Sequence, residues 1–363
     1  MPSTSSAALF NAIDPARIPE LLRSMPKAEL HMHIEGSLEP ETIFALAARN
    51  KIALPYDNVE ALRGAYEFHN LQSFLDLYQI GAGTLRSQRD FHDMADAYIQ
   101  TASRDNVVHA EIFFDTQSHA ANGLSPDDVI NGLHEACVAA PARHGSTAGL
   151  ILCFLRHLSE AEAFEALDHA SAHRDKIVGI GLASSEMGHP PEKFKRAFDR
   201  AREMGFRLVA HAGEEGPPSY IRSALDDLKV DRIDHGVRVL EDSSLVARLA
   251  SSRIPLTVCP LSNTRLKVFS HMGLHPLKKM LEAGLAPSVH SDDPSYFGGH
   301  VNENLIQAHA ALDFTAAQAY ALSRNSFEAS FIDAAAKQAH IDRLDAHFSA
   351  FAAEPAVSRR PRP

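Results

Sequence analysis

The sequence alternates short apolar, β-branched runs with longer segments of helical spacing, and this alternation constrains the fold most strongly. Eight runs have the length and composition of buried strands: 27–33, 106–114, 149–157, 176–184, 206–212, 232–236, 254–260 and 285–293. The segments between them carry helix formers, as in 190–205 and 243–252. A strand that leads each time into a helix is typical of βα units around a parallel sheet. Eight such units predict an α/β fold, the closed (β/α)8 TIM-type barrel.

An open, doubly wound sheet is the alternative architecture. It would need a glycine-rich phosphate loop after the first strand, and the sequence there, HIEGSLEPE, contains no GxGxxG. The run 41–100 is too long for one crossover helix, so we expect extra helices over the C-terminal mouth of the barrel. We predict an N-terminal extension over 1–20, a single barrel domain over 21–350, and a disordered, basic, Pro-rich tail over 351–363.

The composition of the chain excludes some classes of binding partner and some locations. The 35 basic and 46 acidic residues give a formal net charge of −11, which disfavours nucleic acid or an anionic membrane surface as a partner. No apolar stretch approaches the ~18 residues of a membrane span, and no signal peptide is recognisable. The cysteines are Cys137, Cys153 and Cys259, and they form no CxxC pair or disulfide framework, which fits a soluble, cytoplasmic protein. Cys153 and Cys259 lie in predicted apolar strands, so we expect both to be buried. Nothing in the sequence predicts an oligomeric state.

Metal-binding side chains gather at the predicted ends of the strands, where barrels of this kind carry their functional groups. His31 and His33 end the first strand, and alternate strand residues share one face. His211 lies near the end of the fifth strand, and Asp292 near the end of the eighth. Three imidazoles and one carboxylate suit Zn²⁺ and leave a position for water.

Each of these residues also has a less specific interpretation. A His-x-His pair on a strand is more often structural than metal-binding, and an Asp-Asp pair before proline usually forms a turn or a helix cap. Alone, His211 would be a core histidine, and His235 a turn histidine. However, these histidines and aspartates occur together at four predicted strand ends, all at one rim of the barrel. This coincidence favours a metal site.

The motifs ELHMHIEGSLEPE, SFLDLY, HAGEEGPP, RIDHGVR, TVCPLSNT and SDDPSYFGG occur in this order between about residues 28 and 333. With these motifs the chain resembles the adenosine/adenine deaminase family of the amidohydrolase superfamily. HIEG together with HAGEEGPP is similar to the adenine deaminase branch of fungi and bacteria. This resemblance implies a zinc-dependent hydrolase of C–N bonds in cyclic amidines. Its implied reaction converts adenine and water to hypoxanthine and ammonia, as part of purine salvage.

The resemblance also implies a role for each residue of the site. It implies one Zn²⁺ per chain, bound by His31, His33, His211 and Asp292. Glu214 corresponds to the proton donor, His235 to the histidine that orients the attacking hydroxide and can take its proton, and Asp293 to the residue at purine N7. The chemistry agrees, because zinc lowers the pKa of water to ~7 and burial raises the pKa of a carboxyl that must protonate N1.

Glu35 is the position that bears on the choice between base and nucleoside. The nucleoside branch has an Asp here, associated with the ribose, and a longer carboxylate would fill that space and accept a hydrogen bond from a purine N–H. An N9-glycosylated purine lacks this hydrogen, so we predict the free base as substrate. The alternative is that Glu35 caps the following helix.

At two positions the sequence differs from the adenine deaminase branch, and these differences are compatible with other substrates. Ala183 stands where that branch more often has Asp, and Gln79 replaces an aromatic residue. Adenines substituted on N6, such as cytokinin-type bases, are therefore the nearest alternative, followed by adenosine. Ser184, beside Ala183, is expected in the substrate pocket.

Other classes of function fit the sequence less well. A two-metal barrel hydrolase acting on a phosphotriester, lactone or cyclic amide would want a lysine after the fourth strand, where the sequence reads GLASSE. A non-catalytic binding protein would be expected to lack one of the site residues. The stripe Phe68, Leu71, Phe74, Leu75 and Tyr78 fits equally an apolar lid over the substrate and a core-facing helix.

Overall fold

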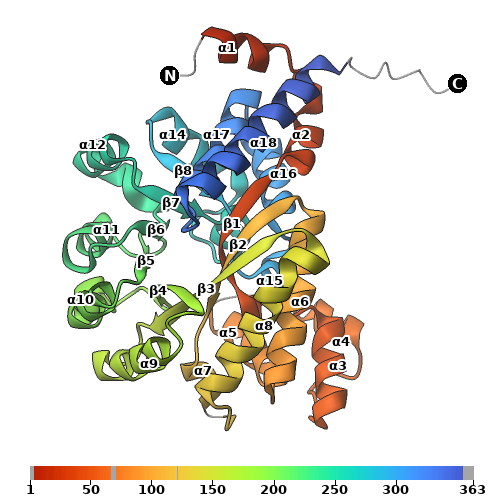
Figure 1. Cartoon of the computed structure of the whole chain (residues 1–363), viewed down its shortest axis with the longest axis vertical. Helices are drawn as coiled ribbons and strands as arrows, with labels where there is room; N and C mark the ends of the chain where they lie inside the picture. The colour runs from red at the N-terminus through yellow and green to blue at the C-terminus, as the bar shows by residue number, and fades with distance from the viewer. Residues whose placement is uncertain (1–3, 67–70, 121, 355–363) are drawn as a thin grey trace, which may run out of the picture.

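The computed structural model describes residues 4–66, 71–120 and 122–354, with only the backbone described for 4–7, 71–73, 75 and 76. Within them, eight parallel strands follow one another around a barrel in sequence order (Figure 1). They are β1 (Lys27–His33), β2 (Val107–Phe114), β3 (Thr147–Leu155), β4 (Ile177–Ala183), β5 (Arg207–Ala212), β6 (Arg232–His235), β7 (Pro255–Val258) and β8 (Ala286–Val289). All eight predicted strands are present, and the predicted TIM-type barrel is confirmed.

The barrel closes between β1 and the residues that follow β8. Met32 forms a parallel bridge with Asp292. The N–H of Asp292 donates to the carbonyl of His31 at 3.0 Å, and the N–H of His33 donates to the carbonyl of Asp292 at 2.8 Å. Closure of the barrel therefore fixes Asp292 beside the two histidines of β1.

Helices cover the outside of the barrel, most of them between consecutive strands (Figure 1). The connections after β2 contain α7 (Gln117–Ala120), α8 (Pro126–His144), α9 (Glu160–Ala172), α10 (Lys195–Glu203), α11 (Pro218–Ser223), α12 (Ser243–Ser252), α13 (Pro260–Arg265) and α14 (Leu277–Glu282). After β8 follow α15 (Pro294–Phe297), α16 (Val301–Leu312), α17 (Ala316–Ala329) and α18 (Ala334–Ala353). Shorter turns of helix are η1 (Pro15–Arg17), η2 (Ile34–Ser37), η3 (Pro191–Phe194), η4 (Ala224–Leu228), η5 (Val237–Glu241) and η6 (Met272–Leu274).

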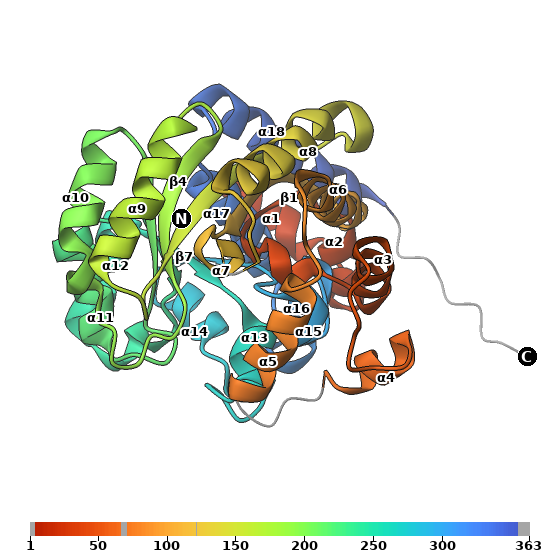
Figure 2. The same cartoon turned by 90° about the horizontal axis from the view of Figure 1, so that it is seen from below.

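The long connection between β1 and β2 holds the predicted extra helices, α3 (Pro40–Asn50), α4 (Val59–Gly64) and α5 (Leu71–Ala82), before α6 (Gln88–Arg104) packs on α8. Helix α5 lies against α15 at the mouth of the barrel, where the rings of Phe74 and Phe297 are 5.0 Å apart (Figure 2). Phe74 and Tyr78 line a pocket there, as the lid interpretation requires, and Phe74 also belongs to the apolar core. Phe68 and the side chains of Leu71 and Leu75 lie outside the described residues.

The two ends of the described chain meet on one side of the barrel (Figure 1). Helix α1 (Thr4–Asn11) contacts α17 and α18, and α2 (Ile18–Ser24) follows it. Helix α18 continues to Ala353 with Phe351 buried, so the first residues of the predicted tail are helical, and 355–363 lie outside the described part. In the chain that the structure describes, every helix is too short or too polar to cross a membrane.

Candidate active site

A cavity of about 750 Å³ opens at the carboxyl ends of the strands. A small apolar cluster in the barrel interior, with Phe113, Ile151 and Val209, includes Cys153 and Ala183, which also line this cavity. Most of the predicted site residues line it: His33, Glu35, Ser184, His211, Glu214, His235, Asp292 and Asp293. His31 is fully buried beside them. The structure thus brings together residues from five separate parts of the chain.

Three imidazoles and one carboxylate converge at the base of this cavity. The Nε2 atoms of His33 and His211 are 3.2 Å apart. Oδ1 of Asp292 lies 3.5 Å from Nε2 of His33 and 3.6 Å from Nε2 of His31. Tetrahedral ligands at ~2.0–2.1 Å from a metal ion would be ~3.3 Å from one another, so these separations suit a shared cation.

The second nitrogen of His31 and of His211 faces a partner that orients the ring. Nδ1 of His31 lies 3.1 Å from the carbonyl of Thr257 and 3.0 Å from its hydroxyl, which itself donates to Asp234. Nδ1 therefore carries the proton, and Nε2 presents a lone pair. Nδ1 of His211 faces Asp234 at 3.5 Å. Partners of this kind are typical of metal-binding histidines.

Nε2 of His31 is buried and finds no hydrogen-bond partner among the described residues. Burial and neighbouring imidazoles lower the pKa of both His31 and His33 well below the ordinary value, so both rings are neutral. Burial raises the pKa of Asp292, so its charged form needs a compensating cation. An unsatisfied lone pair, neutral imidazoles and a buried carboxyl together fit a divalent metal ion.

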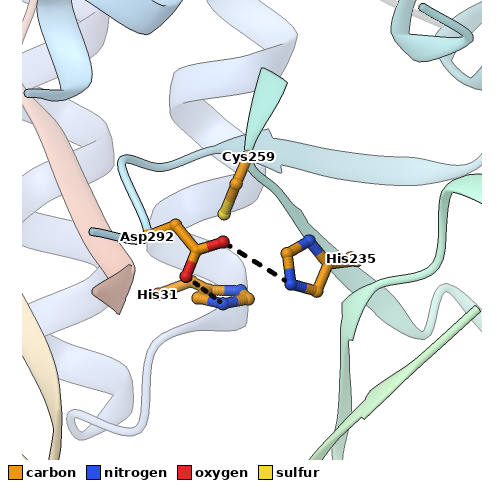
Figure 3. A group of neighbouring side chains, drawn as sticks. All are labelled: His31, His235, Cys259 and Asp292. Atoms are coloured by element: carbon orange, nitrogen blue, oxygen red, sulfur yellow. Dashed lines mark ion pairs between the residues drawn. The ribbon is translucent and has the colours of Figure 1, made fainter. Parts of the chain in front are cut away.

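Cys259 also approaches this group. Figure 3 shows its side chain directed toward Asp292, His31 and His235, whose ligand atoms all lie within 4.8 Å of one another. Burial and the nearby Asp292 raise the pKa of the Cys259 thiol well above its ordinary value. Because the thiolate is the form that binds metals, the histidines and Asp292 are the better ligands. The prediction that Cys153 and Cys259 are buried is confirmed.

Glu214 and His235 lie over the same centre. Nε2 of His235 is 3.5 Å from Oε2 of Glu214 and 3.7 Å from Oδ2 of Asp292. Burial, Asp292 and Glu186 raise the pKa of Glu214 well above its ordinary value. The raised pKa favours the protonated form of Glu214, which is the form that can give up a proton.

Three residues of the site have left-handed backbone conformations, which are rare outside glycine. They are Ser184 with φ of 78°, His235 with 62° and Asp292 with 64°. Such outliers concentrate at functional sites, where the surrounding structure holds them in place. The left-handed residue Ser184 directly follows β4, which explains why this strand ends at Ala183.

Asp293 and Glu35 lie on the wall of the cavity beside the metal ligands. Burial and Asp292 raise the pKa of Asp293 well above the ordinary value, which favours the protonated carboxyl, a hydrogen-bond donor. A Cβ atom on Gly36 would collide with Asp293, so glycine is required for this close approach. Ser184 lies at the rim, and its hydroxyl is 2.7 Å from Nδ1 of His157.

Glu35 has partners that the sequence did not reveal. Its Oε1 is 2.7 Å from Nε2 of His119, and its Oε2 accepts a hydrogen bond from the Tyr78 hydroxyl at 3.3 Å. Burial lowers the pKa of His119, but the hydrogen bond and charge of Glu35 outweigh this and raise it. The capping alternative is wrong, because Glu35 lies inside η2, away from the N-terminus of α3.

Glu186 is a second residue that sequence reasoning missed. Its carboxylate accepts backbone hydrogen bonds from Gly213, Glu214, Glu215 and Gly216 at 2.6, 3.0, 2.9 and 2.8 Å. Glu186 follows β4 and the turn follows β5, which is the neighbouring strand. The one signal in the sequence is the place of Glu186, two residues after the predicted fourth strand, at the same rim as the other site residues.

The fold and the site define a class of protein: a (β/α)8 barrel with three histidines and an aspartate at a common centre beside a buried glutamic acid. The chain belongs to the adenosine deaminase family, whose model matches residues 26–347.

Named relatives resemble the chain over almost its whole length. An adenine deaminase of Albidiferax ferrireducens is 63% identical over 92% of this chain and 97% of its own. The crystal structure of an adenine deaminase from Arthrobacter aurescens is 48% identical, with a TM-score of 0.87, over 89% of this chain and 99% of its own. A Burkholderia ambifaria amidohydrolase solved with bound zinc is 28% identical, with a TM-score of 0.84, over 98% and 96% of the two chains.

Proposed function

We propose that this protein is a zinc-dependent adenine deaminase that converts adenine and water to hypoxanthine and ammonia. Membership of the family makes it a hydrolase of C–N bonds. The observation that carries the proposal is the buried Glu214 carboxyl, 3.5 Å from His235, beside the centre of His31, His33, His211 and Asp292, in a chain whose relatives include adenine deaminases. The reaction would belong to purine salvage. The buried, free cysteines support a cytoplasmic location.

In this proposal His31, His33, His211 and Asp292 hold one Zn²⁺. Zinc bound there would act as a Lewis acid that makes water a nucleophile at neutral pH. His235 would hold the attacking oxygen in line with purine C6. Nothing in the arrangement requires a nucleotide cofactor or a covalent link to the protein.

The proton transfers can be assigned to this chain's own side chains. When the water oxygen bonds to C6, the ring loses its aromaticity and an electron pair moves to N1, which Glu214 protonates. The Glu214 carboxylate then takes one proton from the water oxygen and passes it to the amino group, which leaves as ammonia. It takes the second proton from the same oxygen as the C6 carbonyl forms, which restores the neutral acid. The neutral carboxyl of Asp293 donates a hydrogen bond to N7, whose lone pair can only accept.

Glu35 favours the free base over the nucleoside. Its carboxylate is almost fully buried and is held by His119 and Tyr78, so it stands ready to accept a hydrogen bond from a purine N–H. A site built around such a bond rejects an analogue without it by ~10⁴–10⁵. Adenine substituted on N6 is the second candidate, because the small side chains of Ala183 and Ser184 line a cavity of about 750 Å³.

A comparison of substrates tests this assignment. Adenine, adenosine and N6-isopentenyladenine are each mixed with the protein, and the change in ultraviolet absorbance is followed. We expect adenine to have the highest kcat/KM and Glu35→Gln to lower it, while Glu39→Gln, outside the cavity lining, leaves it unchanged. Faster turnover of adenosine than of both bases would contradict the role of Glu35.

The metal is tested separately. Elemental analysis of the purified protein should find about one zinc per chain, and a chelator should abolish activity that added zinc restores. His33→Ala should lose the metal, whereas His271→Ala, at an exposed histidine, should keep it. Full activity in a metal-free sample would refute zinc dependence.

A further inference from the structure

A chain of buried side chains leads from a backbone N–H to His235. His275 lies just before α14, and its Nδ1 is 3.3 Å from the backbone nitrogen of Leu277. Its Nε2 lies 3.1 Å from Oδ1 of Asn263, on α13. Nδ2 of Asn263 lies 3.3 Å from Nδ1 of His235 and 3.5 Å from Oε1 of Glu214. His235, Asn263 and His275 are all buried.

The backbone N–H at the start of this chain determines the direction of every hydrogen bond in it. An amide N–H can only donate, so Nδ1 of His275 accepts. Burial lowers the pKa of His275 to about 3, so its ring is neutral and carries its one proton on Nε2. That N–H donates to Asn263, which fixes the amide with its oxygen toward His275 and its NH₂ group toward His235.

The last bond decides the protonation of His235. The amide NH₂ group of Asn263 can only donate, so Nδ1 of His235 must accept. A ring nitrogen that accepts a hydrogen bond carries no proton, so this geometry leaves a single proton position on the imidazole. Its proton is therefore on Nε2, the atom that faces Glu214 and Asp292.

We propose that Asn263 and His275 are positioning residues that hold His235 in its Nε2–H tautomer, so that His235 donates a hydrogen bond into the reaction centre. This inference rests on the proposed function for the meaning of that centre. A histidine in this tautomer steadies and aims the attacking oxygen but has no lone pair there to accept its proton. The resemblance implies two roles for His235, which are to orient the attacking oxygen and to take its proton. The Nε2–H tautomer permits the first role only, so the proton of the oxygen goes to the Glu214 carboxylate.

The experiment reads the tautomer directly in the zinc-loaded protein. Side-chain nitrogen NMR of protein with isotope-labelled histidine distinguishes a protonated from an unprotonated ring nitrogen. The signals of His235 are those missing from His235→Ala. We expect Nδ1 of His235 to be unprotonated and Nε2 to be protonated.

Substitutions of Asn263 and His275 should change both the tautomer of His235 and kcat. In Asn263→Asp an acceptor of the same shape replaces the donor, so Nδ1 of His235 becomes protonated. We expect kcat to fall by up to about 10⁴, the loss that a wrong histidine tautomer causes in a serine protease triad. His275→Leu frees the Asn263 amide, and we expect a mixture of tautomers and a kcat about tenfold lower. His275→Gln keeps a donor for Asn263 and should restore both. KM and zinc content should change little in all three.

The matched control is His271→Leu, an exposed histidine on the same connection. It should leave the His235 signals and kcat as in the original protein. A protonated Nδ1 in the original protein, or an unchanged tautomer in both Asn263→Asp and His275→Leu, would overturn the proposal. The NMR readout needs no substrate, so a failed relay is distinguishable from a failed assignment of adenine as substrate.

Discussion

The chemistry proposed for Glu214 depends on an acid that keeps its proton at neutral pH. Burial raises the pKa of its carboxyl, and the negative charges of Asp292 and Glu186 raise it further. A raised pKa means that the neutral form persists to higher pH and is lost as the pH rises through the raised value. The same residue in an exposed loop would be ionised at pH 7 and could not protonate a purine nitrogen.

Replacement of Glu214 separates proton transfer from metal binding. Glu214→Gln cannot release a proton, so we expect kcat to fall by about 10²–10⁴. Zinc content should stay at that of the original protein, because Glu214 is not among the proposed ligands. Steady-state kinetics and elemental analysis measure the two quantities, with the exposed Glu282→Gln as control. An unchanged kcat would remove Glu214 from the mechanism.

The same acid predicts a pH dependence. In the original protein we expect kcat/KM to fall as the pH rises through the raised pKa of Glu214, because the acid then loses its proton.

At the scale of elements, the turn after β5 is held by a residue after β4. Four consecutive backbone N–H groups, from Gly213 to Gly216, point at the carboxylate of Glu186. Consecutive N–H groups in a turn form a concave site for an anion, and here a side chain of the protein fills it. The turn therefore takes its shape from the neighbouring strand connection, and with it the direction of the Glu214 side chain.

Glu186→Gln tests this anchor. The amide has one acceptor atom and would direct N–H groups at other N–H groups, so part of the turn loses its partners. We expect a loss of about 1–3 kcal/mol in the free energy of unfolding and a fall in kcat. Loss of the negative charge should also lower the pKa of Glu214, which moves the alkaline limb of the pH profile to lower pH.

The control is Glu192→Gln, an exposed acid in η3 that accepts a hydrogen bond from the Ser223 hydroxyl. It should leave the pH profile unchanged. Zinc should be retained in both variants, because His211 lies within β5 itself. A Glu186→Gln protein with an unshifted pH profile and normal kcat would show that the turn needs no anchor.

At the scale of the whole molecule, a buried ion pair inside the barrel connects strands that are far apart in the sequence. Arg232 on β6 donates to Glu111 on β2 at 2.6 Å and to the carbonyls of Leu30 at 3.1 Å and Ala329 at 3.3 Å. Burial opposes the charge on Glu111, but Arg232, His109 and the backbone N–H of Phe331 outweigh it and lower the pKa of Glu111 to about 2. One guanidinium thus links β1, β2, β6 and α17, so these elements should unfold together.

This pair predicts how the stability of the fold depends on pH. Because the folded-state pKa of Glu111 lies below its unfolded value, its contribution is complete above about pH 4.5 and is lost as the pH falls toward about 2. The shift corresponds to about 3 kcal/mol. Urea unfolding across this range should therefore show a smaller loss of stability in Glu111→Gln than in the original protein.

Glu111→Gln should also be less stable at pH 7, because it leaves the buried guanidinium without a charged partner. The exposed Glu282→Gln should show the pH dependence of the original protein. An equal pH dependence in Glu111→Gln and the original protein would contradict the role of this pair.

Local patterns were enough to predict the fold and most of the candidate site. The apolar runs predicted all eight strands, because the continuous apolar pattern of a buried strand is visible in the local sequence. The spacing of His31 and His33 predicted a shared face, and the order of strands around a barrel predicted that His211 and Asp292 would meet them. The predicted eighth strand, 285–293, was too long at its carboxyl end, because the periodicity does not reveal the irregular backbone between Val289 and the left-handed Asp292.

The partners of these residues could not be predicted, because each contact joins segments far apart in the chain. His119 meets Glu35 across 84 residues, and Thr257 meets His31 across 226. The sequence by itself determined which elements form and which side chains stand at their carboxyl ends. Only the tertiary structure decided which nitrogen, oxygen or N–H each side chain faces. Hydrogen-bond direction and burial arise when the barrel closes, and they determine the charge and tautomer of every group in the site.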